Sequence, residues 1–200
     1  MKSKLIVLEG GEGAGKSTQI ELLKKYCDPT ITEFTREPGG TLLGEQLRAF
    51  ILNNEMSAES ELINFLSARS VLMERVVRPA LAKGKTVISD RFGLSTIAYQ
   101  IYGRERQDLL PLLLQLSKGI VREVQPFYVL LDIDPEIGIE RASRRGEMNR
   151  LDAENIAFHH RVREGYLAHY DTLGAGVRID ASQPVEEVAR DIQHVLGRFC

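Results

Sequence analysis

Residues 5–23, LIVLEGGEGAGKSTQIELL, run from a short apolar segment through a glycine-rich turn into an amphipathic segment. The turn, residues 10–17, has the spacing G-x-x-x-x-G-K-S, which is the P-loop pattern. Its glycines let successive backbone N–H groups point inward around an anion, and the following helix directs its positive end to the same place. The alternative is a glycine-rich turn that only allows a tight connection between a strand and a helix. The complete pattern predicts a strand–turn–helix unit that binds the phosphates of a nucleoside triphosphate.

Three side chains of this turn add chemistry to the backbone. Lys16 would bring a full positive charge near the β- and γ-phosphates, and the Ser17 hydroxyl would be a Mg²⁺ ligand. Glu12 is unusual here, because a carboxylate that pointed inward would repel phosphate. We expect it to face outward, toward a hydroxyl, a cation or an arginine, or simply toward solvent. The residues predicted to bind the triphosphate are Gly10, Gly11, Glu12, Gly13, Ala14, Gly15, Lys16, Ser17 and Thr18.

The rest of the chain alternates short apolar segments with longer helical patterns. The predicted strands lack polar alternation, as expected for a parallel sheet that is covered on both faces. Helices between the strands predict a three-layer α/β fold, and 200 residues suit one domain. The predicted strands are residues 4–9, 31–35, 86–90, 127–132 and 176–180. The predicted helices are residues 16–26, 41–53, 58–83, 93–101, 105–123, 135–144, 152–172 and 184–198.

Charge and composition exclude some classes of partner. Lys and Arg total 26 against 28 for Asp and Glu, so the net charge of −2 offers no general attraction to nucleic acid. No segment approaches the length of a membrane span, and the LLPLLL run at residues 109–114 is predicted to be a buried helix. Cys27 and Cys200 make no metal-binding or disulfide pattern, which favours a reduced, cytoplasmic setting.

Two arginines follow predicted strands. Arg36 comes after the second strand, in FTREPGGT, and Arg91 after the third, in VISDRF. The carboxyl ends of parallel strands share one edge of the sheet, which also carries the P-loop. Two guanidinium groups there could hold a phosphate by paired hydrogen bonds, although each could instead form a surface salt bridge. Asp90 ends its strand where a carboxylate would hold Mg²⁺ through water; an N-cap or a partner for Arg91 is the alternative.

Further along the chain, Phe65 and Arg69 are four residues apart on a predicted helix and therefore share one face. Such a ring could stack on a base while the guanidinium reads its edge; a core phenylalanine beside a solvated arginine is the alternative. The segment ERASRRGEMNR, residues 140–150, is rich in arginine around Gly146. It is either a solvated basic loop or a mobile lid that closes over the triphosphate and excludes water.

Two other classes of nucleotide-binding protein fit less well. The sequence DRFG at residues 90–93 satisfies the D-x-x-G pattern of GTPase switches, but no N-K-x-D motif follows. A module that only binds nucleotide would not need the further arginines. A phosphotransferase would need them, because it must clamp a second anionic substrate and neutralise the moving phosphoryl group.

From Leu5 to Ile192 the chain resembles the thymidylate kinase family. The resemblance rests on GGEGAGKST, TREPGGT, the F-x-x-x-R pair, DRFGLSTIAYQ, the arginine-rich segment and IDASQP at residues 179–184. It implies a P-loop nucleoside monophosphate kinase fold with a central parallel five-stranded sheet. It also implies the reaction of ATP with dTMP to give ADP and dTDP in dTTP biosynthesis, with Mg²⁺, and usually a homodimer.

The resemblance assigns roles to individual residues. Arg36 and Arg91 would hold the dTMP phosphate, Phe65 would stack on thymine, and Arg69 would donate to the exocyclic oxygen of the base. Tyr99 would crowd the 2′ side of the sugar, and Glu12 would lie near the 3′-hydroxyl and Arg91. The remaining dTMP-binding residues by resemblance are Pro38, Ser95, Thr96, Gln100 and Tyr166. Those that would cradle the adenine of ATP are Arg141, Ala181, Ser182 and Gln183, and Arg144 would also bind ATP.

One departure concerns the cation that assists transfer. Some family members have an arginine in the P-loop directly after the acidic residue, where this chain has Gly13. Members without it resemble this chain in supplying the cation from the lid, here residues 141–152. Arg145 and Arg150 are the first candidates and Arg144 the next; the spacing does not decide among them.

Overall fold

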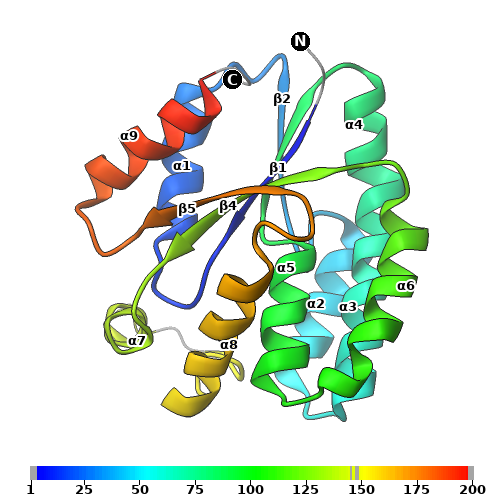
Figure 1. Cartoon of the computed structure of the whole chain (residues 1–200). Helices are drawn as coiled ribbons and strands as arrows, with labels where there is room; N and C mark the ends of the chain where they lie inside the picture. The colour runs from blue at the N-terminus through cyan, green and yellow to red at the C-terminus, as the bar shows by residue number, and fades with distance from the viewer. Residues whose placement is uncertain (1–3, 145, 147–148, 198–200) are drawn as a thin grey trace.

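The computed structural model describes residues 4–144, 146 and 149–197. A five-stranded, all-parallel sheet lies between two layers of helices (Figure 1). The strand order is β2-β3-β1-β4-β5, so the strand that leads into the P-loop is central. The predicted three-layer α/β fold is confirmed. The strands are β1 (Leu5–Glu9), β2 (Thr32–Arg36), β3 (Thr86–Asp90), β4 (Pro126–Asp132) and β5 (Ala175–Asp180).

The helices follow the predicted ranges closely. They are α1 (Lys16–Tyr26), α2 (Leu42–Asn53), α3 (Ala58–Leu72), α4 (Arg78–Ala82), α5 (Gly93–Thr96), α6 (Leu110–Val121), α7 (Pro135–Ser143), α8 (Ile156–His169) and α9 (Val185–Leu196). Two π-helical segments, η1 (Met73–Val77) and η2 (Ile97–Gly103), continue α3 and α5, and a 3₁₀ turn, η3 (Gln107–Leu109), precedes α6.

Helix α8 begins later than its predicted start. Residues 152–172 were expected to be helical, but α8 starts at Ile156. The side chain of Asn155 accepts a hydrogen bond from the backbone N–H of Phe158 at 3.0 Å, which is the geometry of an N-cap. The preceding turn is therefore available to line the functional site.

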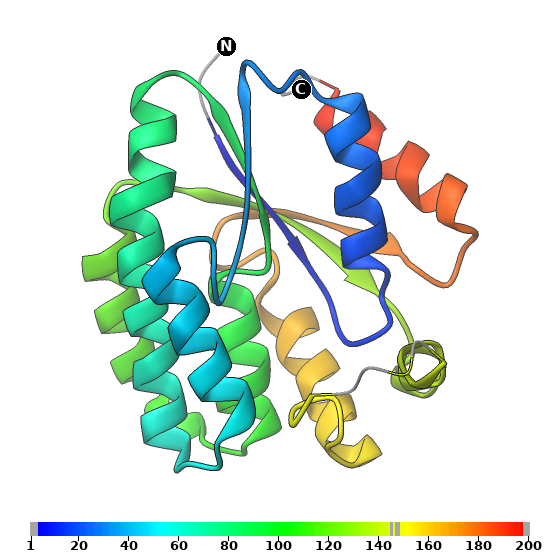
Figure 2. The same ribbon diagram turned by 180° about the vertical axis from the view of Figure 1, so that it is seen from behind.

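The sheet separates two hydrophobic cores. Leu5 and Val7 of β1 face the core formed with α3, η1, η2 and α8, whereas Ile6 and Leu8 face the core formed with α1 and α9. Seen from both sides, α1 and α9 cover one face of the sheet, α2 to α6 and α8 lie on the opposite side, and α7 lies at the edge that carries the P-loop (Figures 1 and 2). Burial on both faces explains why the strand sequences show no polar alternation.

The strand ends bring the predicted phosphate-binding residues to one edge. Arg36 is the last residue of β2 rather than a residue after it, and it pairs in register with Asp90 of β3. Asp90 in turn lies opposite Leu8 of β1, two residues before the P-loop begins at Gly10. Arg36 and Asp90 therefore lie side by side at the edge of the sheet that carries the P-loop.

The LLPLLL run departs from expectation. It forms the start of helix α6, but Leu112, Leu114 and Leu116 are 45%, 41% and 42% exposed, and within α6 only Leu113 is buried. An apolar run cannot place every side chain of a surface helix in the core, because only one face of the helix contacts it. The prediction of a buried helix is therefore wrong. Among the described residues, no helix is long and apolar enough to cross a membrane.

The expectation that the cysteines make no disulfide pattern is also wrong. Cys27, at the end of α1, is 4% exposed and disulfide-bonded. It belongs to the same core cluster as Leu196 at the end of α9, and contacts between these two helices bring segments far apart in the sequence together. Spacing along the chain does not reveal this proximity. The other cysteine, Cys200, lies outside the described residues.

Helix α7 packs directly on the backbone of the P-loop. A Cβ atom at Gly13, where φ is +68°, would lie 1.9 Å from the carbonyl oxygen of Gly138. A Cβ atom at Gly138 would lie 2.3 Å from the carbonyl oxygen of Glu12. No side chain fits between loop and helix, so an arginine at position 13 would displace α7.

We expect Gly138→Ala to lower the free energy of unfolding by about 1–3 kcal/mol, because the added methyl group overpacks the contact between α7 and the P-loop. Gly119→Ala is the matched control. Gly119 lies in helix α6, and a Cβ atom added there would have no neighbouring atom within 4 Å. That change should be neutral or stabilise by up to about 1 kcal/mol. Urea unfolding measures both; equal effects of the two changes would contradict the packing argument.

Candidate active site

The P-loop forms as predicted between β1 and α1. Gly15 adopts a left-handed conformation, with φ +85°, as the residue before the first helical turn. Lys16 begins α1, and its ammonium group donates to the carbonyl oxygens of Gly10 at 3.0 Å and Gly11 at 2.9 Å. Burial, together with the charge of Arg91, lowers the pKa of Lys16 to about 8. The Lys16 ammonium group therefore lies against the P-loop, which would bind phosphate.

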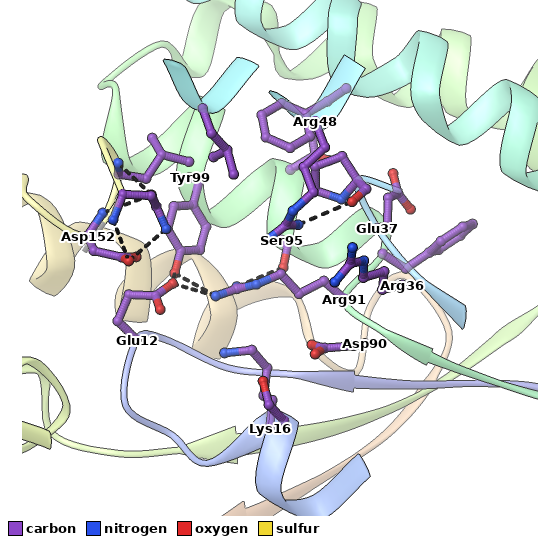
Figure 3. Close-up of a pocket in the computed structure, with 18 of the residues that line it drawn as sticks. Glu12, Lys16, Arg36, Glu37, Arg48, Asp90, Arg91, Ser95, Tyr99 and Asp152 are labelled. Carbon is purple, nitrogen blue, oxygen red and sulfur yellow. Dashed lines mark hydrogen bonds and ion pairs between the residues drawn. The ribbon is translucent and has the colours of Figure 1, made fainter. Parts of the chain in front are cut away.

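Arg91 converges on the same place. Its Nη1 donates to the carbonyl oxygen of Gly10 at 3.1 Å, the acceptor that Lys16 also uses. The same guanidinium donates to the hydroxyl groups of Ser95 at 3.2 Å and Tyr166 at 3.0 Å. The two predicted cations therefore meet at one carbonyl oxygen, and Figure 3 shows Lys16 pointing toward Arg91.

Glu12 faces away from the interior of the loop, as expected. Its Oε1 accepts hydrogen bonds from Arg91 Nη2 at 2.5 Å and from the Tyr99 hydroxyl at 2.9 Å (Figure 3). Burial works to raise the pKa of Glu12, but the charges of Arg91 and Lys16 outweigh it and hold that pKa at about 2. Asp152 lies nearby, and its pKa is raised by burial and by the charge of Glu12. Glu12 therefore loses its proton at a lower pH than Asp152 does.

A single cavity of about 380 Å³ joins these groups to the residues predicted for the base. It extends from the P-loop to helices α3 and η2. The predicted residues that line it are Glu12, Gly13, Gly15, Lys16, Ser17, Thr18, Arg36, Pro38, Phe65, Asp90, Arg91, Ser95, Thr96, Tyr99 and Gln100.

Two residues predicted for the acceptor do not line this cavity. Arg69 is 1% exposed, and it lies 2.7 Å from Glu37 in an ion pair and donates to the Thr96 hydroxyl at 2.6 Å. It therefore supports the wall of the cavity from behind. Tyr166 is likewise 1% exposed, and its hydroxyl contacts Arg91 and Ser95.

Arg48 lines the cavity although no motif indicated it. Its Nη1 donates to the carbonyl oxygen of Pro38 at 3.2 Å. Burial, with the charges of Arg36 and Arg91, lowers the pKa of Arg48. A third guanidinium therefore lines the cavity together with those of Arg36 and Arg91, and Figure 3 shows Arg91 extending toward Glu12. Arg48 comes from the middle of α2, where sequence alone does not tell which helical face meets the site.

Glu9 is the second residue that motif reasoning missed. It ends β1, is fully buried, and accepts hydrogen bonds from the backbone N–H of Phe92 at 2.9 Å and of Ser95 at 3.2 Å. The Ser95 hydroxyl donates to it at 2.5 Å. Burial raises the pKa of Glu9 from its ordinary 4.5 to about 7. Glu9 thus fixes the segment after Arg91; a carboxylate at the end of an otherwise apolar strand was the available signal.

The residues predicted for adenine are also brought together, outside this cavity. Arg141 of α7 donates to the carbonyl oxygens of Ala181 at 2.8 Å and Ser182 at 3.1 Å, in the loop after β5. The side-chain amide of Gln183 donates to the carbonyl oxygen of Asp180 in the same loop.

The two described candidates for the transfer cation, Arg150 and Arg144, contact residues outside the P-loop. Arg150 donates to the buried carboxylate of Glu61 and to the carbonyl oxygen of Ile51 at 3.2 Å. Arg144 is exposed and pairs with Glu140 at 2.5 Å. Arg145 lies outside the described residues. The second half of the lid nevertheless contributes to the cavity, through Asn149, Leu151 and Asp152.

The residues at the phosphate end fit a magnesium ion. Oδ1 of Asp90 is buried and has no hydrogen-bond partner in the described part of the chain, and Ser17 lines the same cavity. Over the described ranges, no three His, Cys, Asp or Glu side chains gather as a metal site. Mg²⁺ needs few protein oxygens when substrate phosphates and water complete its shell, so this arrangement suits it.

A P-loop on the central strand, arginines at the ends of neighbouring strands and an adjoining cavity define a P-loop nucleoside monophosphate kinase. The family model for thymidylate kinase matches residues 8–192. Over its full length the chain is 43% identical to thymidylate kinase of Legionella pneumophila (strain Corby), covering 96% of that protein. It is 42% identical to the thymidylate kinase of Pseudoalteromonas translucida, with 98% of that protein covered. The chain belongs to the thymidylate kinase family, whose function is phosphoryl transfer to dTMP.

A solved structure agrees with this assignment. The crystal structure of thymidylate kinase from Ehrlichia chaffeensis matches with a TM-score of 0.77 at 28% identity. The match covers 98% of this chain and 99% of that one.

Glu9 predicts a specific dependence of stability on pH. Between its ordinary pKa of 4.5 and its folded value of about 7, the unfolded chain is ionised while the folded protein holds the proton. Stability from this group therefore falls as pH rises through that window. The stability of the wild type relative to Glu9→Gln should fall by about 3 kcal/mol between about pH 4 and about pH 8. Urea unfolding at a series of pH values measures this, with Glu21→Gln, a change at an exposed residue, as the control. A difference in the free energy of unfolding between wild type and Glu9→Gln that does not vary with pH would contradict the prediction.

Proposed function

We propose that this chain transfers the γ-phosphoryl group of ATP to dTMP, giving ADP and dTDP, in the cavity described above. The observation that supports this most directly is the meeting of Lys16 and Arg91 at the carbonyl oxygen of Gly10. This contact puts Lys16, which would bind the phosphates of ATP, beside Arg91, which would bind the phosphate of dTMP. Two anions bound to these two cations would lie next to each other.

The donor end rests on the P-loop. Its backbone N–H groups and Lys16 would bind the β- and γ-phosphates, while the cluster of Arg141, Ala181 and Ser182 would hold adenine. Ser17 directly, and Asp90 through water, would hold Mg²⁺, which supplies charge neutralisation between donor phosphates when bound.

The acceptor end begins at the arginine cluster. Arg36, Arg48 and Arg91 would bind the dTMP phosphate; the Arg36 side chain is 54% exposed and pairs with Glu45, so phosphate could replace that partner. Phe65 would stack on thymine. Thr96, held from behind by Arg69, and Gln100 would meet the edge of the base.

Catalysis then needs no covalent intermediate. A phosphate oxygen of dTMP attacks the γ-phosphorus in line, and the protein contributes position and positive charge. Glu12 holds Arg91 in its place through a charge-assisted hydrogen bond. A lid arginine would add a further cation. If that residue is Arg150, it must leave Glu61 as the lid closes.

The test is phosphate-acceptor profiling with ATP and Mg²⁺. We expect kcat/KM for dTMP to exceed that for dCMP, AMP or GMP by about 100-fold or more. Lys16→Ala should lower kcat on the order of 10³-fold. Lys24→Ala, an exposed lysine of the same helix that pairs with Glu21, is the control and should retain activity. ADP release that no acceptor stimulates would refute the proposal.

We also propose that the protein is a homodimer, as the family resemblance implies. Exposed apolar side chains on α2, α3 and α6 support this; they are Leu43, Phe50, Ile63, Leu112, Leu114 and Leu116. Helix α3 packs against both α2 and α6, so the three helices form one layer. Apolar surface of this kind is what a subunit interface covers.

Replacing Leu112 and Leu116 together by Glu should convert the dimer to a monomer, because burying two carboxylates in an apolar interface is unfavourable. Sedimentation equilibrium measures the mass. Val185→Glu is the matched control: Val185 is 44% exposed but lies on α9, across the sheet, and should leave the mass unchanged. A wild-type protein that is monomeric at all concentrations would reject the dimer.

A further inference from the structure

Glu61 is a buried carboxylate that three segments share. It lies in the first turn of α3 and is 1% exposed. Its Oε1 accepts from the side-chain amide of Gln100 at 3.0 Å and from Arg104 at 3.4 Å. Its Oε2 accepts from Arg104 at 3.4 Å and from Arg150 of the lid. One carboxylate thus joins α3, η2 and the lid.

The charge of Glu61 determines how the Gln100 amide is turned. Burial works to raise the pKa of Glu61, but the hydrogen bonds from Gln100 and Arg150 and the charge of Arg104 outweigh it and lower that pKa. An ionised carboxylate only accepts hydrogen bonds. The –NH₂ group of Gln100 must therefore face Glu61, because the reverse orientation would set two acceptors against each other.

With its –NH₂ group toward Glu61, Gln100 has its carbonyl oxygen free to face the cavity. Gln100 lines the cavity that also contains Phe65 and Thr96. Among the described residues, no hydrogen bond uses that carbonyl oxygen. The group presented to a bound base at this point is consequently an acceptor.

We propose that Glu61 is a positioning residue that sets base specificity by holding the Gln100 amide with its carbonyl oxygen toward the acceptor base. Thymine and uracil carry a hydrogen on N3 and can donate to that oxygen. Cytosine has an unprotonated N3, which is itself an acceptor and would be repelled. The inference rests on the proposed function, in that the base of dTMP must reach Gln100.

The experiment compares kcat/KM for dTMP, dUMP and dCMP in wild type and Glu61→Gln. A glutamine at position 61 can donate or accept, so the Gln100 amide is free to turn. We expect the dTMP/dCMP ratio to fall about tenfold or more, because one base-reading hydrogen bond is no longer fixed. The dTMP/dUMP ratio should not change, since both bases carry the N3 hydrogen.

The matched control is Glu59→Gln. Glu59 lies on the same turn of α3, its side chain is 49% exposed, and it pairs with Arg106 rather than with a cavity residue. Neither ratio should move in this variant. A purely structural role for Glu61 would lower kcat/KM for all three acceptors alike and leave both ratios unchanged.

Two outcomes overturn the proposal: a folded Glu61→Gln enzyme that keeps the wild-type dTMP/dCMP ratio, or one in which both ratios fall together. A wild-type enzyme that does not phosphorylate dTMP would instead overturn the proposed function, and it is assayed first.

A measurement on the wild type keeps the inference testable if Glu61→Gln fails to fold. In ¹⁵N NMR, the side-chain amide protons of Gln100 should be protected from solvent exchange with and without dTMP, because they stay bonded to Glu61. The exposed Gln115 gives the unprotected reference. Exchange of the Gln100 amide as fast as that of Gln115 would overturn the proposal.

Discussion

The site depends on two cations, Lys16 and Arg91, that donate to one acceptor, the carbonyl oxygen of Gly10. Two like charges repel at such a separation, and burial makes that repulsion stronger. The carboxylate of Glu12 offsets this repulsion by accepting directly from Arg91, while Glu9 holds the backbone that follows Arg91. Glu12 therefore partly offsets the two positive charges when no ligand is bound. The cations remain available to attract phosphate, which suits a pocket that must bring two phosphates together.

Much of the molecule could be predicted from the sequence, for identifiable reasons. The P-loop has a fixed spacing, and unbroken apolar runs such as residues 86–90 mark strands covered on both faces. Arg36 and Arg91 were predicted at the sheet edge because parallel strands share their carboxyl ends. Those inferences needed only local pattern and topology, and the observed fold agrees with them.

The residues that were missed or misplaced depend on tertiary packing. Arg69, predicted to read the base, pairs with Glu37 and donates to Thr96 behind the wall of the cavity, and its role at the base stays a prediction. Arg48 reaches the site only because of how α2 packs, and Arg150 is held by Glu61. The exposed leucines of α6 show the same limit, because an apolar sequence alone does not tell which of its side chains will be buried and which exposed.

The contact between Gly13 and Gly138 has a consequence for how this protein can change over evolutionary time. At each glycine a backbone oxygen of the other segment occupies the place of a Cβ atom, so a larger residue at either position destabilises the contact unless the two segments move apart. A lineage that gained a cationic side chain within the loop would first have to shift α7 outward. The spacing between the main chains of the P-loop and α7 thus limits whether a cation that assists transfer can come from the loop. A change from a lid arginine to a loop arginine would need substitutions in both segments.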